Sequence, residues 1–222
     1  MIKAVIFDLD GTLLDTIEDI TDSMNTALKA DGFRTYTSTE MKMFVGSGVN
    51  VMVQRALAGA NYTQDQFDSV KAAYMKEYAV KNAIKTKAYP GLVEAIDELR
   101  KLGIKTAVLS NKPQRDTSAT VAHYFSLARF DLVYGQREGV PTKPDPTALL
   151  QMLKALGAAK EECLFVGDSD VDMKTAVNAG MKKIGVLWGF RNREVLVQNH
   201  ADHIITDARE IVAIAKGKHP SH

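Results

Sequence analysis

The sequence predicts an α/β protein: a doubly wound, Rossmann-like parallel sheet with an inserted all-helical cap domain. Two observations support this class. Short apolar runs alternate with longer helical patterns over most of the 222 residues, as in sheets whose strands are joined by crossover helices. From Thr16 to Lys85, however, no segment has the composition of a strand. We therefore expect residues 1–15 and 86–222 to form the core domain and residues 16–85 to form the cap.

Six apolar segments are the expected strands. Several are continuous rather than alternating, which is typical of strands that helices cover on both faces of a parallel sheet. The segments are Ile2–Phe7, Lys105–Leu109, Leu132–Tyr134, Cys163–Val166, Lys183–Leu187 and His203–Ile205. The single cysteine, Cys163, begins one of these runs and is expected to be a small buried hydrophobic residue.

Turn and capping residues mark the expected helices. In the core, Pro90-Gly91 and Gly103 bracket one helix, and Pro146 and Gly157 bracket another. Within the expected cap, a Ser, Thr or Asp followed three residues later by Glu or Gln is a capping box that opens a helix. Three such boxes are Asp15 to Glu18, Thr37 to Glu40 and Thr63 to Gln66.

Charge and hydropathy exclude several classes of function. Lys plus Arg total 28 and Asp plus Glu total 27, so the net charge is +1. This balance argues against a broad nucleic-acid or acidic-membrane surface. No apolar run has the length of a membrane span or of a signal-peptide core. We therefore expect a cytoplasmic protein, monomeric or homodimeric, with no nucleic-acid or membrane partner. The tail from Lys216 to His222 is expected to be frayed.

The strongest functional motif is Asp8-Leu9-Asp10-Gly11-Thr12, where the first expected strand ends. Residues two apart on a strand point to the same side. Two carboxylates about 4 Å apart repel by about 4 kcal/mol at an effective dielectric of about 20. A proton or a bound cation would relieve the repulsion between Asp8 and Asp10. The alternative interpretation is a turn with solvated acids.

A second acidic motif, Gly-Asp-Ser-Asp-Val-Asp at residues 167–172, follows the fourth expected strand. Asp168 lies where ligands bind in open α/β sheets, and Asp172 lies one helical turn further on. N-capping is the alternative, above all for Asp170. Two acidic strand ends side by side would need a metal ion, and oxygen ligands alone point to Mg²⁺ rather than zinc.

Two further segments carry groups that suit phosphate. Ser110-Asn111-Lys112 follows the second expected strand and offers a hydroxyl, an amide and N–H groups at a helix terminus. Lys143 is followed by a proline that limits the local backbone, and lysine is a point charge suited to phosphate. Each feature is weak alone. Together, the acids, a cation site, a hydroxyl and a lysine are the groups that phosphoryl transfer requires.

These motifs, in this order, resemble those of the haloacid dehalogenase-like hydrolase superfamily, and the helical insertion resembles its helical cap. Residues 110–113, 46–48 and 185–189 look closest to the phosphoglycolate phosphatase branch. The resemblance implies a Mg²⁺-dependent phosphatase. It would hydrolyse a small phosphorylated, phosphoglycolate-like metabolite through an aspartyl phosphate intermediate.

The resemblance also implies roles for single residues. Asp8 would be the nucleophile, and Asp10 would be the general acid and base. The carboxylates of Asp8 and Asp168 and the backbone carbonyl of Asp10 would bind Mg²⁺. From outside this ligand set, Asp172 would orient Lys143 or metal-bound water. The expected phosphate-binding residues are Thr12, Ser110, Asn111 and Lys143.

Other activities stay open at this stage. A phosphosugar mutase or a pyrophosphatase of the superfamily would share Asp8, Asp10 and the metal. A dehalogenase would need neither Asp10 nor Mg²⁺. A non-enzymatic phosphoacceptor switch also clusters acids, Ser or Thr and Lys at strand ends, but such a domain is much shorter and lacks a helical insertion.

Basic residues outside the motifs bear on the choice of substrate. Arg34, Lys42 and Arg55 in the expected cap could meet a substrate carboxylate, although cations on helix surfaces are usually solvated. Arg137 and Glu138 are expected near the site and leave the substrate less defined. The Gly-Ser-Gly segment at 46–48 is either a substrate-facing loop or a turn between helices.

Overall fold

The six expected strands form one parallel sheet. In the computed structural model, which describes residues 1–218, the strand order is β5-β4-β1-β6-β7-β8. The strands are β1 (Ala4–Phe7), β4 (Lys105–Pro113), β5 (Leu132–Gln136), β6 (Cys163–Gly167), β7 (Lys182–Val186) and β8 (His203–Ile205). All neighbouring pairs are parallel. Strand β1 lies between β4 and β6, and the chain order runs outward from it in both directions, which confirms the doubly wound class.

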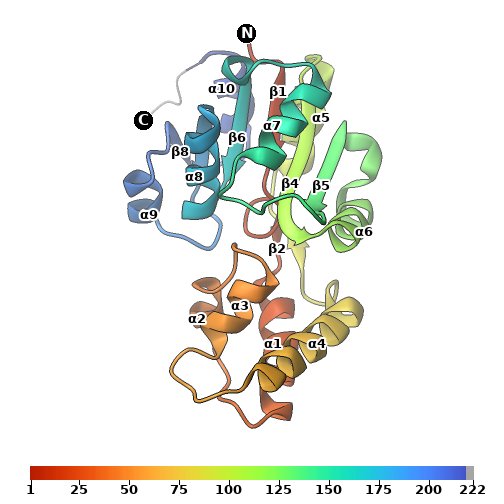
Figure 1. Cartoon of the computed structure of the whole chain (residues 1–222). Coiled ribbons are helices and arrows are strands. Elements are labelled where there is room, and N and C mark those ends of the chain that lie inside the picture. The colour runs from red at the N-terminus through yellow and green to blue at the C-terminus, as the bar shows by residue number, and fades with distance from the viewer. Residues whose placement is uncertain (219–222) are drawn as a thin grey trace.

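Helices cover both faces of this sheet (Figure 1). Val5 and Phe7 of β1 belong to one apolar cluster, whereas Ala4 and Ile6 belong to another. Alternate residues of the strand are therefore buried on opposite faces, as its continuous apolar sequence predicts. The core helices are α5 (Leu92–Lys101), α6 (Gln114–Phe125), α7 (Thr147–Leu156), α8 (Asp170–Ala179), α9 (Arg193–Gln198) and α10 (Arg209–Ala215), with short 3-10 turns at Leu127–Arg129 and Lys160–Glu162.

The segment between β1 and β4 carries the helical cap, which lies beyond the carboxyl ends of the central strands (Figure 1). Met24, Val53 and Val70 are fully buried in an apolar cluster that the cap helices enclose. The capping boxes predicted at Thr37 and Thr63 are present. The cap helices are α1 (Ile17–Ala30), α2 (Ser38–Lys42), α3 (Val49–Ala56) and α4 (Gln64–Lys81). The insertion is helical as predicted, and the domain boundaries stay a prediction.

The capping box predicted at Asp15 is wrong. Thr16 is the N-cap of α1, and its side chain makes no capping hydrogen bond. Asp15 instead belongs to β2 (Leu14–Asp15), which pairs antiparallel with β3 (Lys87–Ala88). Strands of two residues are too short to show a periodic pattern in the sequence. Both connections between the sheet and the cap pass through this ribbon and therefore run side by side.

A buried carboxylate joins the two connections. Asp19 in α1 accepts hydrogen bonds from the backbone N–H groups of Ile84, Lys85 and Thr86, at 3.2, 3.0 and 2.9 Å. It also accepts one from the Thr86 hydroxyl at 2.7 Å. A carboxylate with several such donors is well compensated for its burial. Asp19 therefore fixes where the chain returns from the cap to the sheet.

Three further expectations concern the chain as a whole. Within residues 1–218, no helix has both the length and the apolar composition that a bilayer crossing requires. Cys163 is buried, as expected. Of the tail expected to fray, Lys216 is the C-cap of α10 and pairs with Glu98 at 2.8 Å, whereas residues 219–222 lie outside the described residues.

Candidate active site

The carboxyl ends of β1, β4 and β6 bring the predicted residues together. Asp8 directly follows β1, and Asp168 directly follows β6. Strand β4 is longer than predicted and extends to Pro113, with a register irregularity after Leu109. Ser110 and its two following residues therefore lie within the strand, and no helix begins at this serine. The expected N–H groups of a helix terminus are absent there, because α6 begins four residues later.

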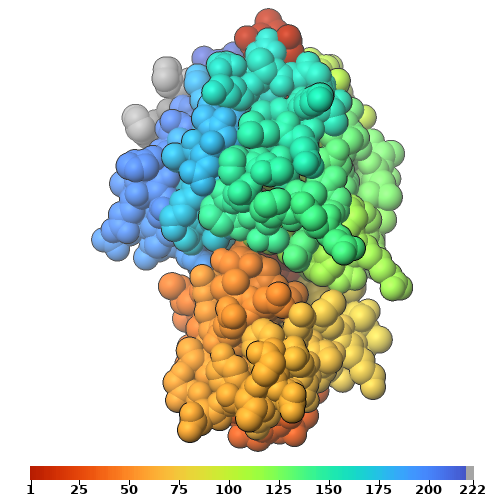
Figure 2. All heavy atoms as spheres, in the orientation of Figure 1, coloured from red at the N-terminus to blue at the C-terminus, as the bar shows by residue number. Residues whose placement is uncertain are grey.

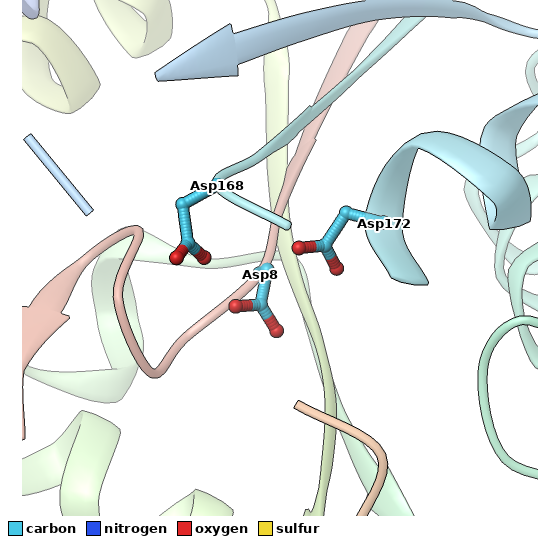
Figure 3. A group of neighbouring side chains, drawn as sticks. All are labelled: Asp8, Asp168 and Asp172. Carbon is cyan, nitrogen blue, oxygen red and sulfur yellow. The ribbon is translucent and has the colours of Figure 1, made fainter. Parts of the chain in front are cut away.

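Three buried aspartates, Asp8, Asp168 and Asp172, form the charged centre of the site. One carboxylate oxygen from each lies within 4.8 Å of the others, and Figure 3 shows the three side chains close together at the ends of their segments. Burial raises the pKa of Asp8 well above its ordinary value; Asp172 and Asp168 raise it further and Lys143 lowers it. Burial also raises the pKa of Asp168 to about 7, with Asp172 adding to the effect. At neutral pH the cluster therefore favours a bound proton or cation.

Lys143 lies inside this cluster. Its Nζ donates to Oδ1 of Asp8 at 2.6 Å and to Oδ1 of Asp172 at 2.7 Å. Burial alone would lower the pKa of Lys143, but Asp172 and Asp8 outweigh it and the pKa is raised. The side chain of Asn111 accepts from the Lys143 backbone N–H at 2.8 Å and donates to its carbonyl at 2.9 Å. Asn111 thereby fixes the charged lysine beside β4.

Asp172 has two structural tasks. Its Oδ2 accepts from the backbone N–H and the hydroxyl of Ser169, at 3.1 and 2.6 Å, which completes a capping box at the start of α8. Its Oδ1 accepts from Lys143. Asp172 therefore both caps the start of α8 and contacts Lys143. Asp170, by contrast, pairs with Lys174 one turn along the helix at 2.9 Å and with Nε of Arg191 at 3.7 Å.

Asp168 is held in a close-fitting cradle. Its carboxylate accepts from the Thr12 hydroxyl at 3.1 Å and from the Phe190 backbone N–H at 2.7 Å. A Cβ added at Gly11 would lie 2.5 Å from Oδ2 of Asp168, and one at Gly189 would lie 2.3 Å from its Cβ. Only glycine allows the backbone to approach this closely. The Thr12 side chain therefore supports Asp168, and its contact with phosphate stays a prediction.

Asp10 lies beside the three-aspartate cluster and not within it. Its Oδ1 accepts a hydrogen bond from Nζ of Lys112 at 2.8 Å. Lys112 also donates to the hydroxyl of Tyr78, which belongs to α4 of the cap, at 2.9 Å. Lys112 belongs to the Ser110-Asn111-Lys112 motif, but no role was predicted for its side chain from the sequence. Its spacing of two from Ser110 on a strand was the available indication that both side chains reach the site.

A cleft between the sheet and the cap opens beside Asp8. The loop at 46–48 faces it, because both of its glycines line the cleft, and the Asn111 amide donates to the Gly46 carbonyl at 2.9 Å. Figure 2 shows the cap packed against the core next to this region. The lining from the core is Asp8, Asp10, Ser110, Asn111 and Lys112, and that from the cap is Ile20, Val45, Gly46, Gly48, Val49, Met52 and Tyr74.

The basic cap residues considered from the sequence do not line this cleft. Arg34 pairs with Glu40 at 2.6 Å. Arg55 donates to the backbone carbonyls of Met43 and Phe44 and so fixes the loop after α2. Both guanidinium groups therefore support the cap itself. Neither arginine reaches the cleft that would hold a substrate carboxylate.

Arg191 is a contact that the sequence did not indicate. It lies after β7 in the core, is buried, and donates to the backbone carbonyls of Lys42 and Val45 in the cap. The preceding Phe190 packs in the apolar cluster of the cap. Since the Phe190 N–H also holds Asp168, this short segment links the acid cluster to the cap. Arg137, as expected, lies near the site, in a pocket that Ser110 and Lys143 also line.

The family is decided by comparison with known proteins. The model of haloacid dehalogenase-like hydrolases matches residues 5–186. The chain belongs to the haloacid dehalogenase-like hydrolase family. This confirms the resemblance stated from the motifs.

Individual relatives of this hydrolase carry a more specific name. "Phosphoglycolate phosphatase 1" of Pseudomonas aeruginosa is 31% identical over 96% of this chain and 79% of its own length. "Phosphoglycolate phosphatase" of Mesorhizobium japonicum is 31% identical over 96% of this chain and 97% of its own length. A crystal structure from Lactobacillus delbrueckii subsp. bulgaricus is 35% identical, with a TM-score of 0.91, covering 96% of this chain and 98% of the other. The likeness to the phosphoglycolate phosphatase branch is thereby confirmed.

The acid cluster of this hydrolase fits a divalent metal ion. Its ligand atoms are carboxylate oxygens, which are the donors that hard cations prefer. The cluster is buried, and burial together with the neighbouring Asp172 raises the pKa values of Asp8 and Asp168, which disfavours their ionised forms. A bound cation would favour those forms. The site can therefore bind a metal.

Proposed function

We propose that this hydrolase removes the phosphoryl group from a small phosphorylated metabolite, with Mg²⁺ as its metal ion. One observation carries the proposal. Among the described residues, Asp8 is the one member of the three-aspartate cluster that lines both the cleft beneath the cap and a smaller adjoining pocket, which Asp168 and Asp172 line with it. The carboxylate of Asp8 therefore lies where a substrate in the cleft would meet the charged groups of the smaller pocket. Asp168 and Asp172 shape its charge environment.

The first step would transfer the phosphoryl group to the protein. An oxygen of Asp8 attacks phosphorus, and the bond between phosphorus and the leaving oxygen breaks. Asp10 gives its proton to that leaving oxygen. Ser110 and Lys143 hold the phosphoryl oxygens, and the positive charge of Lys143 offsets the charge that they carry. Lys112 supports Asp10 through the hydrogen bond described above.

The second step would release phosphate. Water attacks the phosphorus of the aspartyl phosphate, and Asp10 takes up the proton of that water. The bond between phosphorus and the Asp8 oxygen breaks, which restores the free carboxylate. Bound Mg²⁺ would supply charge neutralisation to the carboxylates and to the phosphoryl group. The carboxylates of Asp8 and Asp168 and the backbone carbonyl of Asp10 would hold it.

We propose a phosphoglycolate-like substrate, because the relatives that match along nearly the whole chain bear that name. The cap side of the cleft supports a small substrate. Ile20, Val49 and Met52 line it and are apolar, and among the described cap residues of this lining only Tyr74 carries a side-chain hydroxyl. The cap therefore offers few hydrogen bonds to the several hydroxyl groups of a sugar, which argues against the mutase alternative. We further propose a cytoplasmic monomer or homodimer, which the single buried thiol fits.

A phosphate-release screen with Mg²⁺ over a panel of phosphorylated metabolites, including 2-phosphoglycolate, tests this function. We expect 2-phosphoglycolate among the best substrates, with one free phosphate released for each substrate consumed. Product analysis on sugar phosphates separates hydrolysis from isomerisation. A protein that releases phosphate from no member of the panel, or that only isomerises sugar phosphates, would refute the proposal.

A further inference from the structure

Beyond the smaller pocket that holds Lys143 and Arg191, one positive charge faces the substrate cleft. Among the described residues that line this cleft, Lys112 alone is a cation. Its side chain is only 7% exposed, so the ammonium group is largely removed from water. A buried cation needs partners, because its desolvation is unfavourable. The partners of Lys112 therefore indicate what this position is built to hold.

The ammonium group of Lys112 retains one donor for a ligand. A lysine has three N–H donors. One reaches Asp10 at 2.8 Å and one reaches the Tyr78 hydroxyl at 2.9 Å. The hydroxyl of the cap tyrosine therefore fixes the position of the ammonium group. Within the described part of the chain, the third donor meets no acceptor.

The position of Lys112 relative to Ser110 sets what it can reach. The two residues are two apart on β4, which corresponds to about 7 Å along an extended chain. A phosphoryl group held at Ser110 would therefore leave a neighbouring substituent, one or two carbon atoms away, close to Lys112. The cap side of the cleft, with Val49 and Met52, offers no competing charge.

We propose that Lys112 selects phosphoric monoesters that carry a carboxylate next to the phosphorylated carbon, and that Tyr78 holds its ammonium group in place. The inference rests on the proposed phosphatase activity and deepens it by assigning the residue that recognises the substrate. Recognition of the carboxylate comes from a core strand, and the cap contributes by steadying the lysine. Because Tyr78 lies on α4, the recognising group is fully assembled only with the cap in this position.

Two matched substrates test the proposal: 2-phosphoglycolate and its uncharged amide, 2-phosphoglycolamide. We compare kcat and KM of the unmodified protein with those of Lys112→Met. The unmodified protein should prefer the carboxylate, and the variant should lose about 10- to 100-fold of that preference, chiefly through KM, since a charge-assisted hydrogen bond is lost. Any effect of Lys112 on Asp10 changes both substrates alike and cancels in the ratio.

Three further variants sharpen the test. Lys112→Arg keeps the charge and should retain part of the preference, whereas Tyr78→Phe should weaken it by roughly threefold, because it removes one neutral hydrogen bond. Lys71→Met is the matched control: Lys71 lies at an outer cleft between cap and core and its loss should leave the preference unchanged. If Lys112→Met does not fold, Lys112→Arg and Tyr78→Phe still measure how the preference for the carboxylate substrate depends on this lysine.

The outcomes separate this inference from the proposed function. An equal loss on both substrates in Lys112→Met, with the preference intact, would show that the lysine serves Asp10 alone and would overturn the inference. So would an unmodified protein that hydrolyses both substrates equally well, although the phosphatase function would then stand. Failure of the unmodified protein to release phosphate from either substrate, or from any of the metabolite panel, would contradict the proposed function and the inference together.

Discussion

The two sides of the cleft are built in different ways. On the sheet side, Asp8 and Lys143 are buried and held together by charge, with a 2.6 Å contact between them. On the cap side, Ile20 and Met52 are apolar and contribute shape. Phosphoryl transfer needs charges at fixed distances, whereas a small substrate needs a fitted enclosure. We expect changes in the buried acid cluster to affect every substrate alike. Changes at the cap lining, or at Lys112 of β4 where it meets Tyr78 of the cap, should alter the choice among substrates.

The largest expected effect comes from the nucleophile. Asp8→Asn should lower phosphate release by about 10⁴-fold or more with every substrate, because loss of a nucleophile removes the whole covalent route. Initial rates with p-nitrophenyl phosphate and 2-phosphoglycolate measure this. The matched control is Asp207→Asn, which follows β8 and pairs with the exposed Arg209 and should stay within about threefold because exposed ion pairs contribute little. A loss of rate in Asp8→Asn that differs between the two substrates would contradict the expectation that the acid cluster affects every substrate alike.

Asp10→Asn should have the second-largest effect. Hydrolysis should fall by about 10²- to 10⁴-fold, the usual contribution of a general acid and base. With p-nitrophenyl phosphate the leaving group needs little protonation, so a burst of nitrophenol followed by slow turnover should appear in stopped-flow absorbance. Full steady-state activity in this variant would remove Asp10 from the mechanism.

Metal binding should depend on pH in a direction that the acid cluster sets. The folded-state pKa of Asp168 is about 7 and its ordinary value is 3.8, and the pKa of Asp8 is raised as well. Between pH 3.8 and about 7, Asp168 is protonated in the metal-free folded protein but ionised in the unfolded chain. The folded protein therefore binds more protons, and the stability that this proton binding contributes is lost as pH rises toward about 7. Mg²⁺ should therefore raise the denaturation temperature more at about pH 8 than at about pH 5.

Thermal denaturation with and without Mg²⁺ at both pH values measures this difference. Asp168→Asn is the informative variant, because it removes one of the groups whose pKa is raised. Its denaturation temperature without metal should depend less on pH. An equal Mg²⁺ effect at both pH values in the unmodified protein would show that the cluster does not bind the ion.

The smallest expected effect concerns the connections that bring the two sides together. Asp19→Asn replaces a buried carboxylate that accepts hydrogen bonds from Lys85 and Thr86. Loss of the charge should destabilise the protein by about 1.5–3 kcal/mol, which urea denaturation can measure. Phosphate release under stable conditions should change only a few-fold, because the charged side of the cleft is untouched. A loss of activity as large as that of Asp10→Asn would mean that the two sides are not separable.

The sequence predicted the sheet because its physical causes are local. Continuous apolar strands such as Ala4–Phe7 are buried on both faces, and capping residues such as Thr37 and Thr63 specify helix starts. The ribbon of Leu14–Asp15 with Lys87–Ala88 could not be predicted. Its two short strands are distant in sequence and meet only because the cap helices between them are folded.

The site was predictable to the extent that it lies at strand ends. Asp8 and Asp168 meet because parallel neighbouring strands end at one edge. The contacts of Lys112 with Tyr78 and of Arg191 with the cap carbonyls join segments from different domains. No sequence pattern encodes such contacts, because they depend on the angle at which the cap docks. Substrate choice is therefore harder to derive from the sequence than the chemistry is.

The capture of phosphorus by Asp8 can be observed directly. Asp10→Asn is mixed with p-nitrophenyl phosphate and Mg²⁺, quenched in acid during the burst, digested with a protease and analysed by mass spectrometry. We predict one phosphoryl group on the peptide that contains Asp8, with the modification absent from Asp8→Asn treated in the same way. A phosphoryl group on any other residue, or a burst of nitrophenol without a phosphorylated peptide, would contradict a covalent mechanism at Asp8.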